Sequence, residues 1–277
     1  MQEHTDGDQR DVYDSFRTAV ASLLGGDPDH KSLVQGLANG LPEGLTRPKF
    51  IATLFACFES KSWQSPTSTA RSNWLWRHEG TDHSKQRPEV ALEREIVRRG
   101  GTDNWSFQMS TMSGVFEAGT HQRRAIDLVH RTGFGTFELI ELKVGSNNPV
   151  FAAFEILGYG LAYCCARRHR DIHSQRSEHD ILRARGIKLV VLAPTAWYQF
   201  NLRGESKQDF QLEAFSSAFN VGLENLRTDL ALSDLDTLKF EFRRFVDETS
   251  LLKQIEAGEP AGVPLAWKAP GGAPAKR

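Results

Sequence analysis

Hydrophobic residues recur along the chain with two periodicities, one typical of helices and one typical of strands. Residues 12–24 and 48–60 carry apolar side chains at helical spacing, and Pro48 stands at a helix start. From Pro88 onward, apolar segments with strand-like alternation lie between helical ones. They predict a helix over 88–100, extended chain over 105–110, strands over 123–130 and 137–144, a helix over 149–168, a strand over 187–193, a helix near 209–227 and a strand over 237–245. The order of the first six segments, helix, three strands, helix and strand, predicts an α/β core.

Turn-forming residues between these segments set the expected boundaries. Residues 1–86 are expected to form a helical N-terminal extension or subdomain, because Gly-, Pro- and Asp-rich turns separate its helices. Residues 87–257 are expected to form the α/β domain, in which the TGFGT segment at 132–136 is a hairpin turn. Residues 258–277 are rich in Pro, Gly and Ala, which predicts a disordered tail.

The composition narrows the class of protein without identifying it. The chain has 277 residues, of which 39% are hydrophobic and 25% charged, as in a globular protein. A formal net charge of −1 gives no global support for nucleic-acid binding, so any basic surface must be local. The longest apolar run, 150–166, is shorter than the ~20 residues that span a bilayer and contains a glutamate. With three cysteines and no secretory signal at the start, we expect a cytoplasmic protein without a membrane partner.

An acidic residue two positions before a lysine occurs four times in the chain, so this spacing alone carries little information. Only Glu141 and Lys143 lie in a strongly apolar strand that follows a second strand with a lone aspartate, Asp127. Side chains alternate along a strand, so Glu141 and Lys143 share one face while Ile140 and Leu142 share the other. If the hairpin pairs the two strands, the three polar groups converge, and a hard divalent cation relieves the repulsion between the carboxylates. The alternative is a hairpin with surface charges.

Two helical glutamates extend this arrangement. Glu155 is the only charged side chain between Lys143 and Arg167, within a helix whose apolar surface on all sides indicates burial. A buried carboxylate requires a partner, so Glu155 is expected to point at the metal site or to bond a core hydroxyl or arginine. In the first helix of the core, Glu93 lies in the apolar stripe and is expected to face the site, with Glu89 as the second choice. Helix surfaces also carry many glutamates without such a role.

With these features, residues 87–195 resemble the PD-(D/E)xK, or restriction-endonuclease-like, nuclease superfamily over about 110 residues. The resemblance implies a mixed four-stranded sheet flanked by helices in the order αβββαβ. It implies hydrolysis of DNA phosphodiester bonds with Mg²⁺ or Mn²⁺. By position, Asp127 and Glu141 would be metal ligands with the Leu142 carbonyl as a third, and Lys143 would activate the nucleophilic water.

The same resemblance assigns the remaining positions. Glu93 would be the acid of the first helix, and Glu155 with Tyr159 would form the motif of the second. Two positions depart from the pattern, since Ile126 stands where the family name has proline and Glu155 where many members carry glutamine. The basic residues expected to contact the nucleic acid are Arg123, Arg124, Arg167 and Arg168. Related nucleases imply a homodimer or a larger complex.

Two other functions remain open from the sequence. A non-catalytic module on the same fold could bind nucleic acid or a protein, although the intact set of Asp127, Glu141 and Lys143 favours an enzyme. A small-molecule or transcriptional sensor would require a closed apolar pocket, which no sequence feature locates.

A second group of metal-ligand residue types lies near the end of the long apolar helix. Cys165, His169 and His173 recur at four-residue intervals and could share one helical face. A basic, solvated helix end explains these residues without a metal, and structural zinc usually has four ligands. The sequence therefore disfavours zinc at these positions.

Overall fold

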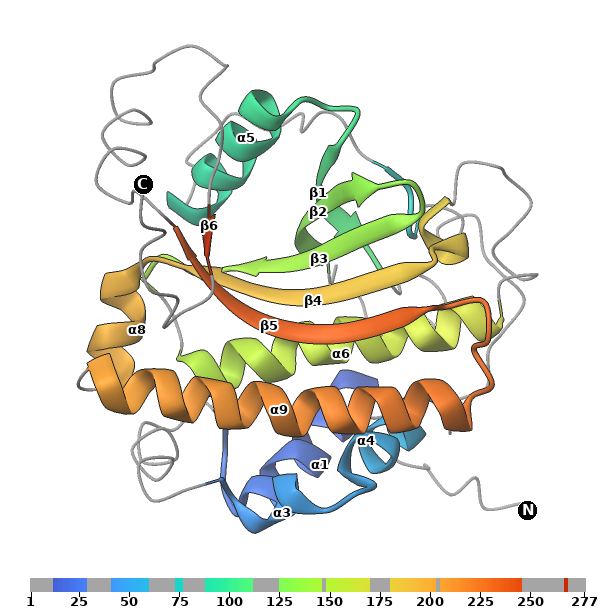
Figure 1. The fold of residues 1–277 in the computed structure, drawn as a ribbon, viewed down its shortest axis with the longest axis vertical. Coiled ribbons are helices and arrows are strands. Elements are labelled where there is room, and N and C mark those ends of the chain that lie inside the picture. Colours follow the sequence, from blue (N-terminus) through green and yellow to red (C-terminus); the bar gives the residue numbers. More distant parts are fainter. Residues whose placement is uncertain are drawn as a thin grey trace, which may run out of the picture.

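The computed structural model describes most of the chain as one mixed β-sheet flanked by helices (Figure 1). The residues described are 12–28, 41–59, 73–76, 88–111, 125–145, 148–169, 180–202, 205–245 and 267–268. The sheet order follows the sequence, from β1 to β6. The strands are β1 (Trp105–Ser110), β2 (Ala125–Gly133), β3 (Thr136–Leu142), β4 (Gly186–Ala193), β5 (Thr237–Phe245) and β6 (Trp267–Lys268).

Both strand directions occur in this sheet. β1, β2 and β3 pair antiparallel, β3, β4 and β5 pair parallel, and β6 is antiparallel to β5. The antiparallel neighbours β2 and β3 connect through a short turn, whereas the parallel steps from β3 to β5 need the helical crossovers seen in Figure 1. The predicted α/β class with a mixed, helix-flanked sheet is confirmed.

The expected number of strands in the sheet is wrong. The sheet has six strands instead of four, because β5 pairs with β4 over residues 237–244 and β6 extends the edge. Within the tail over 258–277, Trp267 and Lys268 pair with Phe245 and Arg244. The remainder of the tail lies outside the described residues.

Helices cover both faces of the sheet. α1 (Val12–Leu24), α5 (Pro88–Gly100) and α6 (Pro149–Arg168) have the bounds that the apolar spacing predicts. The other helices are α3 (Glu43–Thr46), α4 (Phe50–Glu59), η3 (Asp180–Arg183), α8 (Thr195–Leu202) and α9 (Glu205–Asp229). α3, η3 and α8 are too short to show a helical period and were not predicted. α6 is long and apolar enough to cross a membrane, yet 89% of its most apolar window is buried in the fold.

Local chemistry explains why α6 begins where it does. The Asn148 side chain accepts a hydrogen bond from the amide of Phe151 at 2.9 Å, and Pro149 occupies the first turn. An asparagine cap satisfies an amide that has no partner within the helix, and proline has no amide to satisfy there. This start places Glu155 in the second turn of α6.

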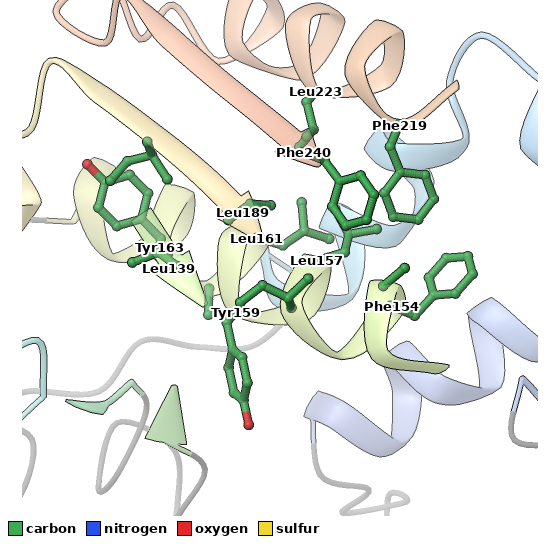
Figure 2. Close-up of a cluster of buried hydrophobic side chains, with 14 of the residues drawn as sticks. Leu139, Phe154, Leu157, Tyr159, Leu161, Tyr163, Leu189, Phe219, Leu223 and Phe240 are labelled. Atoms are coloured by element: carbon green, nitrogen blue, oxygen red, sulfur yellow. The ribbon is translucent and has the colours of Figure 1, made fainter. Parts of the chain in front are cut away.

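Strand alternation divides the apolar residues between two cores. Ile140 and Leu142 of β3 belong to the smaller core under α5, whereas Leu139 belongs to the larger core under α6 and α9. Figure 2 shows part of the larger core, where side chains from α6, α9 and the strands meet. Buried residues of α1 and α4 join this same core. The helices within residues 1–86 therefore pack as an outer layer of the α/β body (Figure 1).

Close packing of α6 on β4 gives a stability prediction. A Cβ at Gly160 would lie 2.5 Å from Cδ1 of Leu189, so alanine requires the buried leucine to move. We expect Gly160→Ala to destabilise the protein by about 1–3 kcal/mol, since overpacking strains a dense core. Thermal unfolding measures this change. Gly133→Ala is the control because its Cβ would meet nothing within 4 Å, and equal melting temperatures for the two variants would contradict the prediction.

Candidate active site

The paired strands β2 and β3 bring the predicted carboxylates together. The antiparallel register that pairs Leu128 with Ile140 places Asp127 opposite Glu141 at the next position. Oδ2 of Asp127 accepts a hydrogen bond of 2.9 Å from the amide of Leu142. The two carboxylates therefore lie on the same face of the sheet.

Lys143 lies between two carboxylates just beyond the end of β3. Its Nζ is 2.6 Å from Oε1 of Glu141 and 2.9 Å from Oε2 of Glu155. Its backbone amide donates to the carbonyl of Leu192 on β4 at 3.0 Å, which holds the residue although the strand has ended. Glu155 therefore reaches from α6 to the cluster that the sequence predicts, and its partner is this ammonium group. The Lys143 and Glu141 side chains are both buried.

Charge and burial act against each other in this cluster. Burial raises the pKa of Glu141 well above its usual value, and the charges of Asp127 and Glu155 raise it further. Burial also raises the pKa of Asp127 to about 6, against the lowering effect of the Lys143 charge. Burial alone would lower the pKa of Lys143, but the surrounding carboxylates outweigh it and raise that pKa instead. With one ammonium for three carboxylates, the cluster favours an additional proton or cation.

One oxygen in the cluster has no hydrogen-bond donor among the residues that the structure describes. Oε2 of Glu141 is buried without a hydrogen-bond partner among the described residues. Such an acceptor costs roughly 1–3 kcal/mol unless something satisfies it. Oxygen ligands from closely placed carboxylates are those preferred by Mg²⁺ and related hard cations. The donor set of Asp127 and Glu141 therefore fits a divalent cation.

The Leu142 carbonyl was expected to be the third ligand. The structure places the Leu142 side chain in the core under α5 and its amide on Asp127. These contacts hold the backbone of Leu142 beside the carboxylates. The role of its carbonyl as a ligand stays a prediction.

Both candidate glutamates of α5 reach this region. Glu93 is buried, and burial followed by the charge of Asp127 raises its pKa to about 8. Its Oε2 accepts a hydrogen bond of 2.7 Å from Nε2 of Gln108. Oε1 of Glu89 accepts one of 3.2 Å from the amide of Val144, at the end of β3. Glu93 therefore interacts electrostatically with Asp127, whereas Glu89 accepts a hydrogen bond from the backbone next to Lys143.

Gln108 is a site residue that sequence reasoning missed. It lies in the middle of β1 with φ 48°, a left-handed conformation that costs a non-glycine residue of order 1–3 kcal/mol. The pairs on either side of it keep one register, which places Gln108 opposite Asp127. No local signal marks a strained glutamine, because the strain and its partner Glu93 appear only in the tertiary structure.

A pocket opens beside Glu155. Tyr159, one helical turn after Glu155, points away from the labelled leucines of α6 in Figure 2. Burial, followed by the charge of Glu141, raises the pKa of Tyr159 well above its usual value. The pocket has a volume of about 50 Å³, and its lining comes from α1, α6 and the segment after α1. The lining residues are Tyr13, Phe16, Arg17, Val20, Pro28, Phe151, Phe154, Glu155 and Tyr159.

Of the basic residues expected to bind nucleic acid, the two that the structure describes, Arg167 and Arg168, lie away from the cluster. Arg167 is buried, and its Nη1 donates to the Tyr163 hydroxyl and the Ala184 carbonyl, both at 2.7 Å. Arg168 pairs with Glu59 at 2.5 Å. Both arginines lie about 18 Å or more beyond Glu155 along the axis of α6, because each residue adds 1.5 Å. Arg167 therefore supports the fold, in contrast to its predicted role.

The other two predicted basic residues, Arg123 and Arg124, lie outside the described residues. Their place relative to Asp127 stays a prediction.

Comparison with known proteins does not assign the chain to a family. No family model matches the chain. No curated protein and no solved structure matches it either. A functional assignment for this chain therefore depends on the geometry and charge of the site.

Proposed function

We propose that the protein is a metal-dependent nuclease that hydrolyses phosphodiester bonds in DNA, with a PD-(D/E)xK site. The main support is the buried cluster in which Asp127 and Glu141 lie side by side and Lys143 bridges Glu141 to Glu155. A site of three carboxylates, one ammonium and an unpaired carboxylate oxygen favours a divalent cation. A binding module has no need of such a costly arrangement.

In this proposal each residue has a distinct role. Asp127 and Glu141, with the Leu142 carbonyl, would hold Mg²⁺ or Mn²⁺. When bound, the cation lowers the pKa of a coordinated water and stabilises charge on the phosphodiester. Lys143 retains its proton because three carboxylates surround it, so it orients the attacking water as a hydrogen-bond donor. Glu155 keeps the Lys143 ammonium in place.

The pocket beside Glu155 indicates where the substrate would lie. Glu155 contributes to both the cluster and the pocket, so a nucleotide cleaved at the cluster would place its neighbour near the pocket. Arg17, whose guanidinium lies 5.8 Å from the Phe151 ring centre, supplies a positive charge for phosphate.

Incubation with nucleic acids tests the proposed function. Purified protein is incubated with plasmid, single-stranded DNA and RNA in Mg²⁺, Mn²⁺ or chelator. We expect cleavage of DNA with either cation and none with chelator. Failure to cleave any of these substrates under every metal condition contradicts the proposal. Retained binding of DNA or a protein in that case supports the non-catalytic module.

The pH dependence of cation binding follows from the raised carboxyl pKa values. A protonated carboxyl is a poor ligand, so Asp127, with a pKa of about 6, binds a cation better as the pH rises through this value. We expect the affinity for Mn²⁺ to increase between about pH 5 and pH 8, as measured by calorimetry. An affinity that stays constant over this range would contradict the assignment of Asp127 as a ligand.

A further inference from the structure

A second group of ligand-type side chains lies away from the acidic cluster, where the ends of α4 and α6 meet. Glu59 is the last residue of α4, Cys165 lies in the last turn of α6 and His169 follows α6 directly. One possible ligand atom from each lies within 4.8 Å of the other two. Oε1 of Glu59 is 3.7 Å from the Cys165 sulfur and 3.9 Å from Nε2 of His169.

These separations are close to those of a tetrahedral metal site. Zinc bonds of about 2.3 Å to sulfur and 2.0–2.2 Å to nitrogen or oxygen place neighbouring ligands roughly 3.3–3.7 Å apart. The side chains therefore need to move only slightly to surround an ion. We propose that Glu59, Cys165 and His169 bind Zn²⁺, with a fourth position open to water or another ligand.

The helical framework favours this arrangement. Cys165 and His169 are one turn apart, and the amide of His169 donates to the Cys165 carbonyl at 3.1 Å. Residues at this spacing share one helical face. The end of α6 also carries the partial negative charge of its free carbonyls, which favours a cation. Cys165 is buried, while the side chains of Glu59 and His169 are 31% and 37% exposed, so an ion can enter from solvent.

The neighbouring Arg168 does not bind the Glu59 oxygen that would coordinate the ion. Arg168 pairs with Oε2 of Glu59, whereas Oε1 is the oxygen near Cys165 and His169. One carboxylate can thus hold the arginine and the ion through different oxygens. Zinc binding to Cys165 would displace the thiol proton, which passes to the buffer.

The two metal sites would select different ions. The acidic cluster offers oxygen ligands, which suit Mg²⁺ and Mn²⁺, whereas thiolate and imidazole suit zinc. Zinc binding at Glu59, Cys165 and His169 is therefore independent of the proposed nuclease activity. Saturating Mg²⁺ should not displace it.

Cobalt provides a spectroscopic test, because Co²⁺ bound to a thiolate absorbs through sulfur-to-metal charge transfer. The full chain is titrated with Co²⁺ in excess Mg²⁺, and Zn²⁺ is then added. We expect the charge-transfer band to reach its maximum at one Co²⁺ per chain and to disappear as Zn²⁺ replaces it. Absence of the band in the wild-type protein overturns the proposal.

Adjacent cysteines supply a matched pair of variants. Cys164 and Cys165 are both buried, but only Cys165 belongs to the group. We expect Cys165→Ser to lose the band and Cys164→Ser to keep it. The partly exposed His169 allows a second test should Cys165→Ser unfold, and His169→Gln should weaken Co²⁺ binding at least about tenfold. Equal Co²⁺ affinity and an unchanged band in His169→Gln, or a band retained in folded Cys165→Ser, overturn the assignment.

Discussion

Asp127→Asn is expected to lower the rate of DNA cleavage at least ~100-fold while the protein stays folded. The amide oxygen of asparagine can still accept the hydrogen bond that the Leu142 amide donates to Asp127 at 2.9 Å. It has no charge, however, and is a much weaker ligand for Mg²⁺ or Mn²⁺ than a carboxylate. The substitution therefore removes the cation-binding charge and retains the contact that joins β2 to β3.

Initial rates of plasmid cleavage and the melting temperature measure the two parts of this prediction. Asp236→Asn is the control, because Asp236 is exposed and pairs with Arg185 at 2.8 Å, away from the cluster. It should cleave at the wild-type rate. Wild-type activity in folded Asp127→Asn would rule out Asp127 as an essential ligand and remove the main support for the proposed nuclease.

Lys143→Met is expected to abolish cleavage and, in chelator, to destabilise the protein by about 2–4 kcal/mol. Methionine fills much of the same volume but leaves Glu141 and Glu155 without the ammonium that lies 2.6 and 2.9 Å from them. Buried carboxylates without a partner must take up protons or draw in water, and both weaken the folded state. Denaturant unfolding in chelator measures the loss.

Addition of Mn²⁺ separates the structural effect of Lys143 from its catalytic effect. A divalent cation replaces the missing positive charge, so Mn²⁺ should stabilise Lys143→Met more than wild type without restoring cleavage. Lys188→Met is the control, because Lys188 is 40% exposed and its contacts with Glu138 and Glu241 are 3.7 and 3.8 Å long. Its stability should change by less than about 0.5 kcal/mol. Equal stability and equal Mn²⁺ response in Lys143→Met and wild type would contradict the role given to Lys143.

Local patterns predicted most of the elements that position the site. The helices α1, α5 and α6 and the strand β5 have the bounds that apolar spacing and turn residues indicate. The same reasoning placed Glu141 and Lys143 on one strand face, because alternation depends only on neighbouring residues. It also required a partner for Glu155, because a lone charge in an apolar helix is costly wherever that helix packs.

The sequence was less informative where the answer depended on which elements pack together. Arg167 looked like a phosphate ligand in the basic run after α6, but it packs into the core and bonds the Tyr163 hydroxyl and the Ala184 carbonyl. The number of strands was underestimated, since the pairing of β6 with β5 depends on the return of the tail to the sheet edge. A run of basic residues in the sequence does not show which of their side chains are buried in the fold.

The sequence by itself determined the order of helices and strands, the hairpin and the carboxylate–lysine set, because these follow from side-chain periodicity over a few residues. Only the tertiary structure decided that Lys143 pairs with both Glu141 and Glu155, that Gln108 bonds Glu93, and that Glu59 meets Cys165 across 106 positions. Each of these contacts joins different elements of the fold. Their distances depend on how helices pack against the sheet and each other, which a local pattern does not specify.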